Sequence, residues 1–272
     1  SPLSILVIVI LGALSVVILY ISPVLIGAMV EIVGFTDAQA GYVIAVEPAG
    51  MFLATFPALY WVPRVNWRKA LLVTLSCMIL GNLLSVGAES FTSLLVLRFL
   101  VGLPAGSSMV ICISIIGLTR DPDRTFGLWV TAQLVLGAIG LFALPVMFPI
   151  LGYGFVYIII ALLILGLLFL VCFLPQQGRS ALKEETRREA DKRPGIVLFW
   201  AFGGLLALFV FYVGQYGIWA YLDRIGASTG LALESIGQAL SLATIVGIAG
   251  AMGAAVLSAR YGRLLPIAIG AA

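Results

Sequence analysis

Residues 158–174 read IIIALLILGLLFLVCFL, a segment that is apolar on every face of a helix. A strand of an outer-membrane barrel would instead alternate apolar and polar residues over about ten positions. A helix of about this length crosses a hydrocarbon core roughly 30 Å thick. The segment therefore predicts a membrane-spanning helix.

Comparable apolar segments recur along the whole chain. The 272 residues are 62% hydrophobic and 10% charged, whereas soluble domains are roughly 45–50% apolar. A water-soluble fold could not cover that much apolar surface. We predict an all-α, polytopic membrane protein with spans at 4–31, 36–62, 68–88, 91–118, 124–150, 153–174, 195–222 and 233–258 and the start of another at 264–272.

Turn and capping residues separate the predicted spans. Thr36, Ser90 and Asp121 precede the second, fourth and fifth spans, and each is a favoured helix N-cap type. One connection is long and carries many charges of both signs, as expected of a soluble linker. We therefore divide the chain into a six-helix bundle (1–175), a charged cytoplasmic linker (176–194) and an incomplete second bundle (195–272).

The positive charges predict the orientation in the membrane. The loops that follow the even-numbered spans and the linker hold nearly all of them, whereas the loops on the other side hold only Arg224. Cytoplasmic loops carry the excess of Lys and Arg, so we place the N-terminus and the linker in the cytoplasm and the protein in the inner (plasma) membrane. The basic loop residues are Arg64, Arg68, Lys69, Arg120, Arg124, Arg260 and Arg263, besides those of the linker.

The composition argues against an enzyme. There is no histidine, and the three cysteines, Cys77, Cys112 and Cys172, stand alone in apolar segments. The absence of histidine excludes imidazole bases. Together with the isolated cysteines, it makes a zinc site unfavourable. A membrane enzyme would need a nucleophile and a base on one face, and no such pair is spaced that way. We expect no catalytic residue, no metal, no cofactor and no nucleic-acid partner.

The order of segments, with six spans, a charged linker and then further spans, resembles that of the major facilitator superfamily. Residues 98–106, RFLVGLPAG, match the family pattern RxxxGxxxG, and residues 257–263, LSARYGR, are similar to its loop signature LaDRxGR with Ala259 in place of aspartate. The corresponding loop at 60–69 keeps only the basic residues. The resemblance implies that the chain is a fragment covering helices 1–8 and the start of 9. It also implies cytoplasmic gate loops, at Arg64, Arg68, Lys69, Arg260, Gly262 and Arg263.

The resemblance implies secondary active transport of a small molecule by alternating access between two bundles. We expect proton-coupled efflux of an amphipathic or aromatic substrate, because the spans are apolar and rich in aromatic residues. The partners would then be the lipid bilayer, the substrate and protons. Two alternatives stay open: uptake of a small organic acid with Arg98 as the anion site, and a truncated relative that does not transport.

Glu47 and Arg98 are the ionisable residues well inside spans. Burying either charged side chain alone in hydrocarbon would cost free energy, so each should face the bundle interior, water or a partner. Their positions along the two spans allow them to pair. We interpret Glu47 as a proton-coupling or substrate residue, with Arg98 shifting its proton affinity. The alternative is a static ion pair that locks two helices together. Pro48 favours a bend beside Glu47.

Span seven carries a polar and aromatic face. Tyr212, Gln215, Tyr216 and Trp219 are spaced i, i+3, i+4 and i+7, which places them on one side of a helix. That side would line a substrate path, or form part of an aromatic belt at the membrane interface. Other candidates for the path, each of which is equally suited to hydrogen bonding between helices, are Tyr20, Asn82, Gln133 and Gln238.

Overall fold

The computed structural model describes residues 2–88, 90–176 and 195–261. All regular elements in these ranges are helical, and eight segments are long and apolar enough to cross a membrane. The prediction of an all-α, polytopic fold is therefore confirmed, and each of the eight segments overlaps one predicted span. The ninth span and the linker fall outside the described residues, apart from Gln176.

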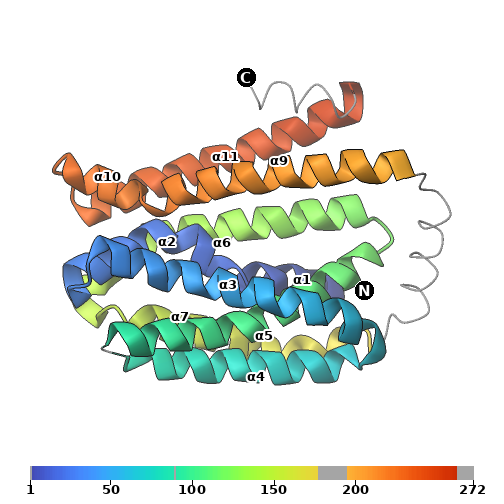
Figure 1. The fold of residues 1–272 in the computed structure, drawn as a ribbon, viewed down its shortest axis with the longest axis horizontal. Coiled ribbons are helices and arrows are strands. Elements are labelled where there is room, and N and C mark those ends of the chain that lie inside the picture. Colours follow the sequence, from blue (N-terminus) through green and yellow to red (C-terminus); the bar gives the residue numbers. More distant parts are fainter. Residues whose placement is uncertain (1, 89, 177–194, 262–272) are drawn as a thin grey trace.

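The helices follow the chain in a simple order (Figure 1). The first span consists of α1, α2 and the π-helical η1, and the short η2 and η3 extend the second and sixth spans. The bounds are α1 (Pro2–Leu14), α2 (Val17–Ala28), η1 (Met29–Val33), α3 (Asp37–Trp61), η2 (Val62–Arg64), α4 (Trp67–Val86), α5 (Phe91–Gly117), α6 (Pro122–Leu151), α7 (Phe155–Leu168), η3 (Phe169–Phe173), α9 (Gly195–Ala220), α10 (Leu222–Ser228) and α11 (Leu233–Tyr261).

Side-chain caps begin the helices where the sequence predicts them. Thr36 Oγ1 accepts a hydrogen bond from the Gln39 N–H at 3.2 Å, and Gln39 Oε1 accepts one from the Thr36 N–H at 3.0 Å. This capping box satisfies two N–H groups that a helix start leaves without partners. Ser90 and Asp121 cap α5 and α6 in the same way through one bond each.

The span predicted at 4–31 corresponds to one membrane span at Pro2–Val33, but the helix within it is not continuous. Its helix is interrupted at Ser15 and Val16, between α1 and α2. The Ser15 hydroxyl donates to the Leu11 carbonyl at 3.0 Å, and the Val16 N–H turns to the Ala13 carbonyl at 3.3 Å. Serine that bonds back to the preceding turn often bends a helix, and such a bond accompanies the break here.

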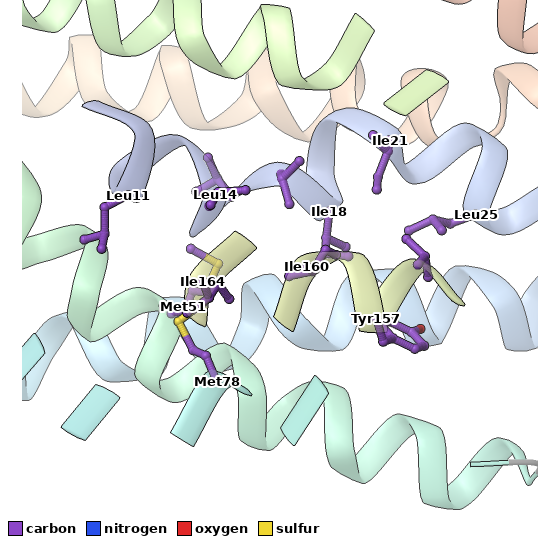
Figure 2. Close-up of a cluster of buried hydrophobic side chains, with 14 of the residues drawn as sticks. Leu11, Leu14, Ile18, Ile21, Leu25, Met51, Met78, Tyr157, Ile160 and Ile164 are labelled. Atoms are coloured by element: carbon purple, nitrogen blue, oxygen red, sulfur yellow. The ribbon is translucent and has the colours of Figure 1, made fainter. Parts of the chain in front are cut away.

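The core of the first bundle lies between the first span and α7, with α3 and α4 beneath. Figure 2 shows Leu14 and Ile18 of the first span facing Ile160 and Ile164 of α7. Met51 and Met78 reach towards the same cluster from α3 and α4. All of these side chains are buried. Apolar packing of this kind fixes which face of each helix points inward.

The second bundle covers one side of the first. Helix α11 packs along α6, and α9 and α10 contact α2, so that α9 and α11 lie on the same side of the molecule, beyond α2 and α6 (Figure 1). The Ser241 hydroxyl of α11 donates to the Ala138 carbonyl of α6 at 2.8 Å. Among the described side chains of α9, most are exposed.

The two ends of the molecule are distinguished by their connections. One end, here called the α10 end, holds α10 and residues 34–36, 87–88, 90 and 152–154. The opposite end, here called the linker end, holds residues 62–66, 118–121 and 174–176, and the Trp67 N–H donates to the Gln176 carbonyl there at 2.9 Å. The N-terminus of α1 lies at the linker end (Figure 1).

Close backbone contact between α3 and α5 gives a test of the fold. A Cβ atom on Gly106 would lie 2.6 Å from Met51 Cα, whereas a Cβ atom on Gly117 of the same helix would meet nothing within 4 Å. We expect Gly106→Ala to lower the free energy of unfolding by about 1–3 kcal/mol, because two backbones must separate. Gly117→Ala should leave it unchanged or slightly raise it. Thermal unfolding in detergent measures both, and equal stabilities would contradict this packing.

Candidate functional site

A cavity of about 440 Å³ lies between the two bundles. Helices α2 and α6 line it from the first bundle, and α9 and α11 line it from the second. A site at this position is contacted by both bundles, so its shape depends on how they sit against each other. The lining residues are Leu19, Tyr20, Leu134, Phe211, Tyr212, Gln215, Tyr216, Trp219, Ala243, Thr244 and Gly247.

Polar contacts hold the aromatic walls of this central cavity in place. The Tyr20 hydroxyl donates to Gln133 Oε1 at 2.8 Å, which joins α2 to α6 behind the cavity. Trp219 Nε1 donates to the Leu19 carbonyl at 3.2 Å and ties α9 to α2. The rings of Tyr212 and Tyr216 stack with their centroids 5.9 Å apart. These contacts therefore hold the aromatic residues of the lining in place.

The cavity combines aromatic surface with a few polar groups. The amide of Gln215 and the hydroxyls of Tyr212 and Tyr216 are the polar groups on the α9 side. Binding sites for small organic molecules are mostly apolar, with a small number of polar groups that set orientation. This lining suits an amphipathic or aromatic molecule, and no charged side chain is among its residues.

A second cavity of about 440 Å³ lies beside the first, between α2, α3 and α9. Tyr212, Tyr216 and Leu19 line both cavities, so the two tyrosines stand between them. The second cavity is almost wholly apolar and reaches Pro48, the residue after Glu47. The tyrosine pair therefore connects the central cavity to the part of α3 that contains Pro48.

Glu47 and Arg98 form an ion pair inside the first bundle. Arg98 Nη1 lies 3.4 Å from Glu47 Oε2, and the two residues are 2% and 4% exposed. The same guanidinium donates to Asn82 Oδ1 at 3.2 Å and to Ser85 Oγ at 2.7 Å. It also lies over the Tyr157 ring, 4.3 Å from its centroid. Four helices thus contribute to one buried charged cluster.

The buried cluster lines neither of the two cavities. Glu47, Arg98 and Asn82 are absent from both linings, and their partners come from α3, α4, α5 and α7. A charge enclosed in this way is stable only when it is paired and hydrogen-bonded. The arrangement can hold four helices together.

The structure brings several of the sequence-predicted path residues together. Tyr20, Tyr212, Gln215, Tyr216 and Trp219 all line the central cavity, and Gln133 lies behind it. Two others lie elsewhere: Asn82 belongs to the buried cluster, and Gln238 is exposed and donates to Glu234 Oε1 at 3.2 Å.

The predicted gate residues are described in part. The Arg64 guanidinium lies over the Tyr60 ring, and Arg68 Nε donates to the Leu174 carbonyl. The backbone N–H of Lys69 donates to Asn66 Oδ1, which caps α4. Arg260 belongs to the last turn of α11. Gly262 and Arg263 lie outside the described residues.

Some residues of these clusters were not predicted. Thr244 lines the central cavity, and Tyr153 shares a hydrogen bond of 2.6 Å with Tyr157 above the buried cluster. The i, i+4 spacing of the two tyrosines was a usable signal, because it places them on one helical face. Among the described residues, no group of three or more His, Cys, Asp or Glu side chains is placed to hold a metal ion.

The buried ion pair predicts strong coupling between its members. Glu47→Leu should lower the free energy of unfolding by about 3–5 kcal/mol, since it leaves Arg98 charged and uncompensated. The double variant with Arg98→Leu should lose less than the sum of the two single variants. Glu234→Gln, at an exposed carboxylate, is the control and should change little. Unfolding in detergent measures all four, and additive losses would refute the coupling.

Comparisons with known proteins agree with this architecture. The model of the Major Facilitator Superfamily matches residues 5–272. A crystal structure of a D-xylose–proton symporter is similar with a TM-score of 0.71 and 12% identity, over 95% of this chain and 70% of that one. The inward-open, partially occluded xylose transporter XylE from E. coli gives 0.66 and 14%, over 96% and 74%.

A POT family transporter in complex with a thioalcohol-conjugated peptide is similar with a TM-score of 0.54 and 19% identity, over 79% of this chain and 47% of that one. No curated protein sequence is significantly similar to this chain. At these identities the solved structures establish the fold, whereas the family model covers nearly all of the chain. The resemblance inferred from the sequence is thereby confirmed, and the chain belongs to the Major Facilitator Superfamily.

Proposed function

We propose that the protein is a secondary active transporter that moves a small amphipathic or aromatic molecule out of the cell by alternating access. The fold supports membrane transport by a secondary transporter. The observation that carries the substrate class is the central cavity, because both bundles line it with aromatic rings and a few uncharged polar groups. A rocking motion of the bundles would expose this cavity to each side of the membrane in turn.

The proposed orientation follows from the basic residues. Arg64, Arg68 and Arg120 lie at the linker end, whereas Arg224 lies in α10 at the opposite end. By the positive-inside rule, the linker end faces the cytoplasm and the α10 end faces the outside of the inner membrane. A molecule that leaves the cell would then enter the cavity from the linker end.

The proposed driving force is the proton gradient, with Glu47 as the coupling residue. Glu47 is paired with Arg98 in this conformation and lies one residue before Pro48, which interrupts the α3 hydrogen-bond ladder. Bending of α3 at Pro48 would separate Glu47 from Arg98 and alter its affinity for a proton. One solved structure of similar fold is that of a D-xylose–proton symporter.

The surroundings of Arg98 do not favour uptake of an organic acid. An anion site needs a guanidinium with free donors facing a cavity, whereas Arg98 is 2% exposed and bonded to Glu47, Asn82 and Ser85. We therefore base the proposal on the central cavity. Absence of flux for every amphipathic or aromatic compound would favour the alternative of a relative that does not transport.

The aromatic wall of the central cavity predicts a binding defect. Tyr216→Ala should raise the apparent KM for an aromatic amphipathic dye roughly ten-fold, the equivalent of losing about 1.4 kcal/mol of ring contact. Phe202→Ala is the matched control, since Phe202 is an aromatic residue of the same helix that is 68% exposed and lines neither cavity. Dye flux in proteoliposomes measures both variants, and equal KM values would count against the cavity.

Proton coupling is tested at Glu47. Glu47→Gln keeps the shape of the side chain and an acceptor oxygen for Arg98 but removes the titrating group. We expect flux in proteoliposomes to lose its dependence on an imposed pH gradient while dye binding persists. Glu234→Gln, which removes an exposed carboxylate of α11, should keep the dependence. A Glu47→Gln protein that still responds to the gradient would remove Glu47 from the mechanism.

A further inference from the structure

Three charged residues join the two bundles at the α10 end. Arg224 of α10 places Nη1 3.4 Å from Glu31 Oε1 of η1 and Nε 3.2 Å from Asp37 Oδ1 of α3. The Tyr221 hydroxyl donates to the Asp37 carbonyl at 3.1 Å beside them. Each of these bonds runs from the second bundle to the first, so each must break when the bundles part at this end.

Asp223 is buried directly beneath this junction. Its exposed fraction is 0%, and its Oδ1 atom has no hydrogen-bond partner. The other oxygen, Oδ2, lies 3.5 Å from Arg224 Nη1, which is a weak contact. A buried carboxylate with an unpartnered oxygen is costly in its ionised form. Protonation removes the charge and supplies an O–H group.

The burial of Asp223 depends on close packing between the bundles. Asp223 faces Gly27 of α2, where a Cβ atom would overlap Asp223 Oδ2 and lie 2.7 Å from both Asp223 Cγ and Leu233 Cδ1. Glycine at this position lets α10 approach the backbone of α2. The seam between α2 and α10 therefore excludes water from Asp223 only while the two bundles are closed at this end.

The surrounding charges also favour a neutral Asp223. Glu31 and Asp37 bring two carboxylates to a junction with one guanidinium, from Arg224. Helix α11 also packs against α10, and Glu234 lies in its first turn. The Glu234 carboxylate accepts a hydrogen bond from Gln238. Helices α2 and α9, which also pack against α10, contain no Asp, Glu, Lys or Arg. An ionised Asp223 would thus face more negative than positive charge.

We propose that Asp223 is a proton-binding site that controls closure of the two bundles at the α10 end. Closure buries the carboxylate and favours its protonated form, whereas opening returns it to water and favours its ionised form. Binding of a proton therefore favours the closed junction. This site goes beyond the proposed substrate and coupling residues, because it acts on the opening of the bundles with or without a substrate.

The direction of the pH dependence follows from the closed structure. Burial raises the pKa of Asp223 from 3.8 to about 6, with Arg224 opposing the rise and Glu31 and Asp37 adding to it. Once exposed, the carboxyl regains its ordinary pKa. The advantage of the closed junction is therefore fully present below about pH 4 and is lost as the pH rises through about 6. Protonation raises the closed-to-open ratio by roughly 100-fold in total. Between pH 8 and pH 5 the ratio rises by roughly ten-fold.

The test is a distance measurement across the junction in the full-length protein in lipid nanodiscs. Spin labels on Ala38→Cys and Ser228→Cys report the separation, since both positions are exposed and belong to different bundles. Cys77 and Cys172, which are exposed, are replaced by serine. Without any substrate, the ratio of short to long distances should rise roughly ten-fold from pH 8 to pH 5. An unchanged ratio overturns the proposal.

Two variants identify Asp223 as the group responsible. Asp223→Asn is neutral at every pH, so the ratio should stay high and constant, whereas the control Glu234→Gln should keep the full response. Gly27→Ala keeps the titrating carboxyl, but its Cβ atom would overlap Asp223 Oδ2, so α10 must move off α2 and the short distance should be rare at every pH. A pH response that survives in either Asp223→Asn or Gly27→Ala overturns the proposal, and the second variant decides if the first does not fold.

The readout is independent of transport. The distances are measured without substrate or gradient, so a failure of the dye-flux experiments leaves them unaffected. Conversely, loss of the pH response in the distances with normal flux would overturn the role of Asp223 and leave the proposed transport intact.

Discussion

Hydrocarbon offers no hydrogen-bond partner to a peptide group, so a segment inside a bilayer must satisfy its own backbone. This constraint makes every described span of the chain helical. It also governs the polar side chains between the spans. The Tyr20 hydroxyl is bonded to Gln133, and the Arg98 guanidinium is bonded to Glu47 and its neighbours. These two contacts join separate spans and help to fix which helix faces meet.

Most of the fold could be predicted because the same constraint produces long apolar segments that are visible in the sequence itself. Apolar length located the eight spans, and capping residues such as Thr36 located the helix starts within a few residues. The interruption at Ser15 could not be predicted. A serine that bonds to the preceding turn lies at the break, but Ser107 and Ser114 make the same bond within the unbroken α5. Nothing in the spacing distinguishes the two outcomes.

The candidate sites were less predictable because they depend on how each helix is rotated. The i, i+3, i+4, i+7 spacing placed Tyr212 and Tyr216 on one face correctly, and both line the central cavity. Gln238 is also a polar residue of an apolar helix, yet it lines neither cavity. Asp223 lies in a connection and is fully buried. Rotation and loop packing are set by contacts between distant segments, such as Gly27 against α10, which the local pattern does not contain.

The two buried acids differ in how a motion of the bundles would affect them. Glu47 and all its partners belong to the first bundle, so a rigid-body rotation leaves its surroundings unchanged. A conformational equilibrium is shifted only by a ligand that binds its two states unequally, and this holds for a proton. Coupling at Glu47 therefore requires a change within the bundle, for which α3 at Pro48 is the available element, because proline removes one hydrogen bond of the helix there. Asp223 lies at the seam itself, so its solvation changes as soon as the bundles part.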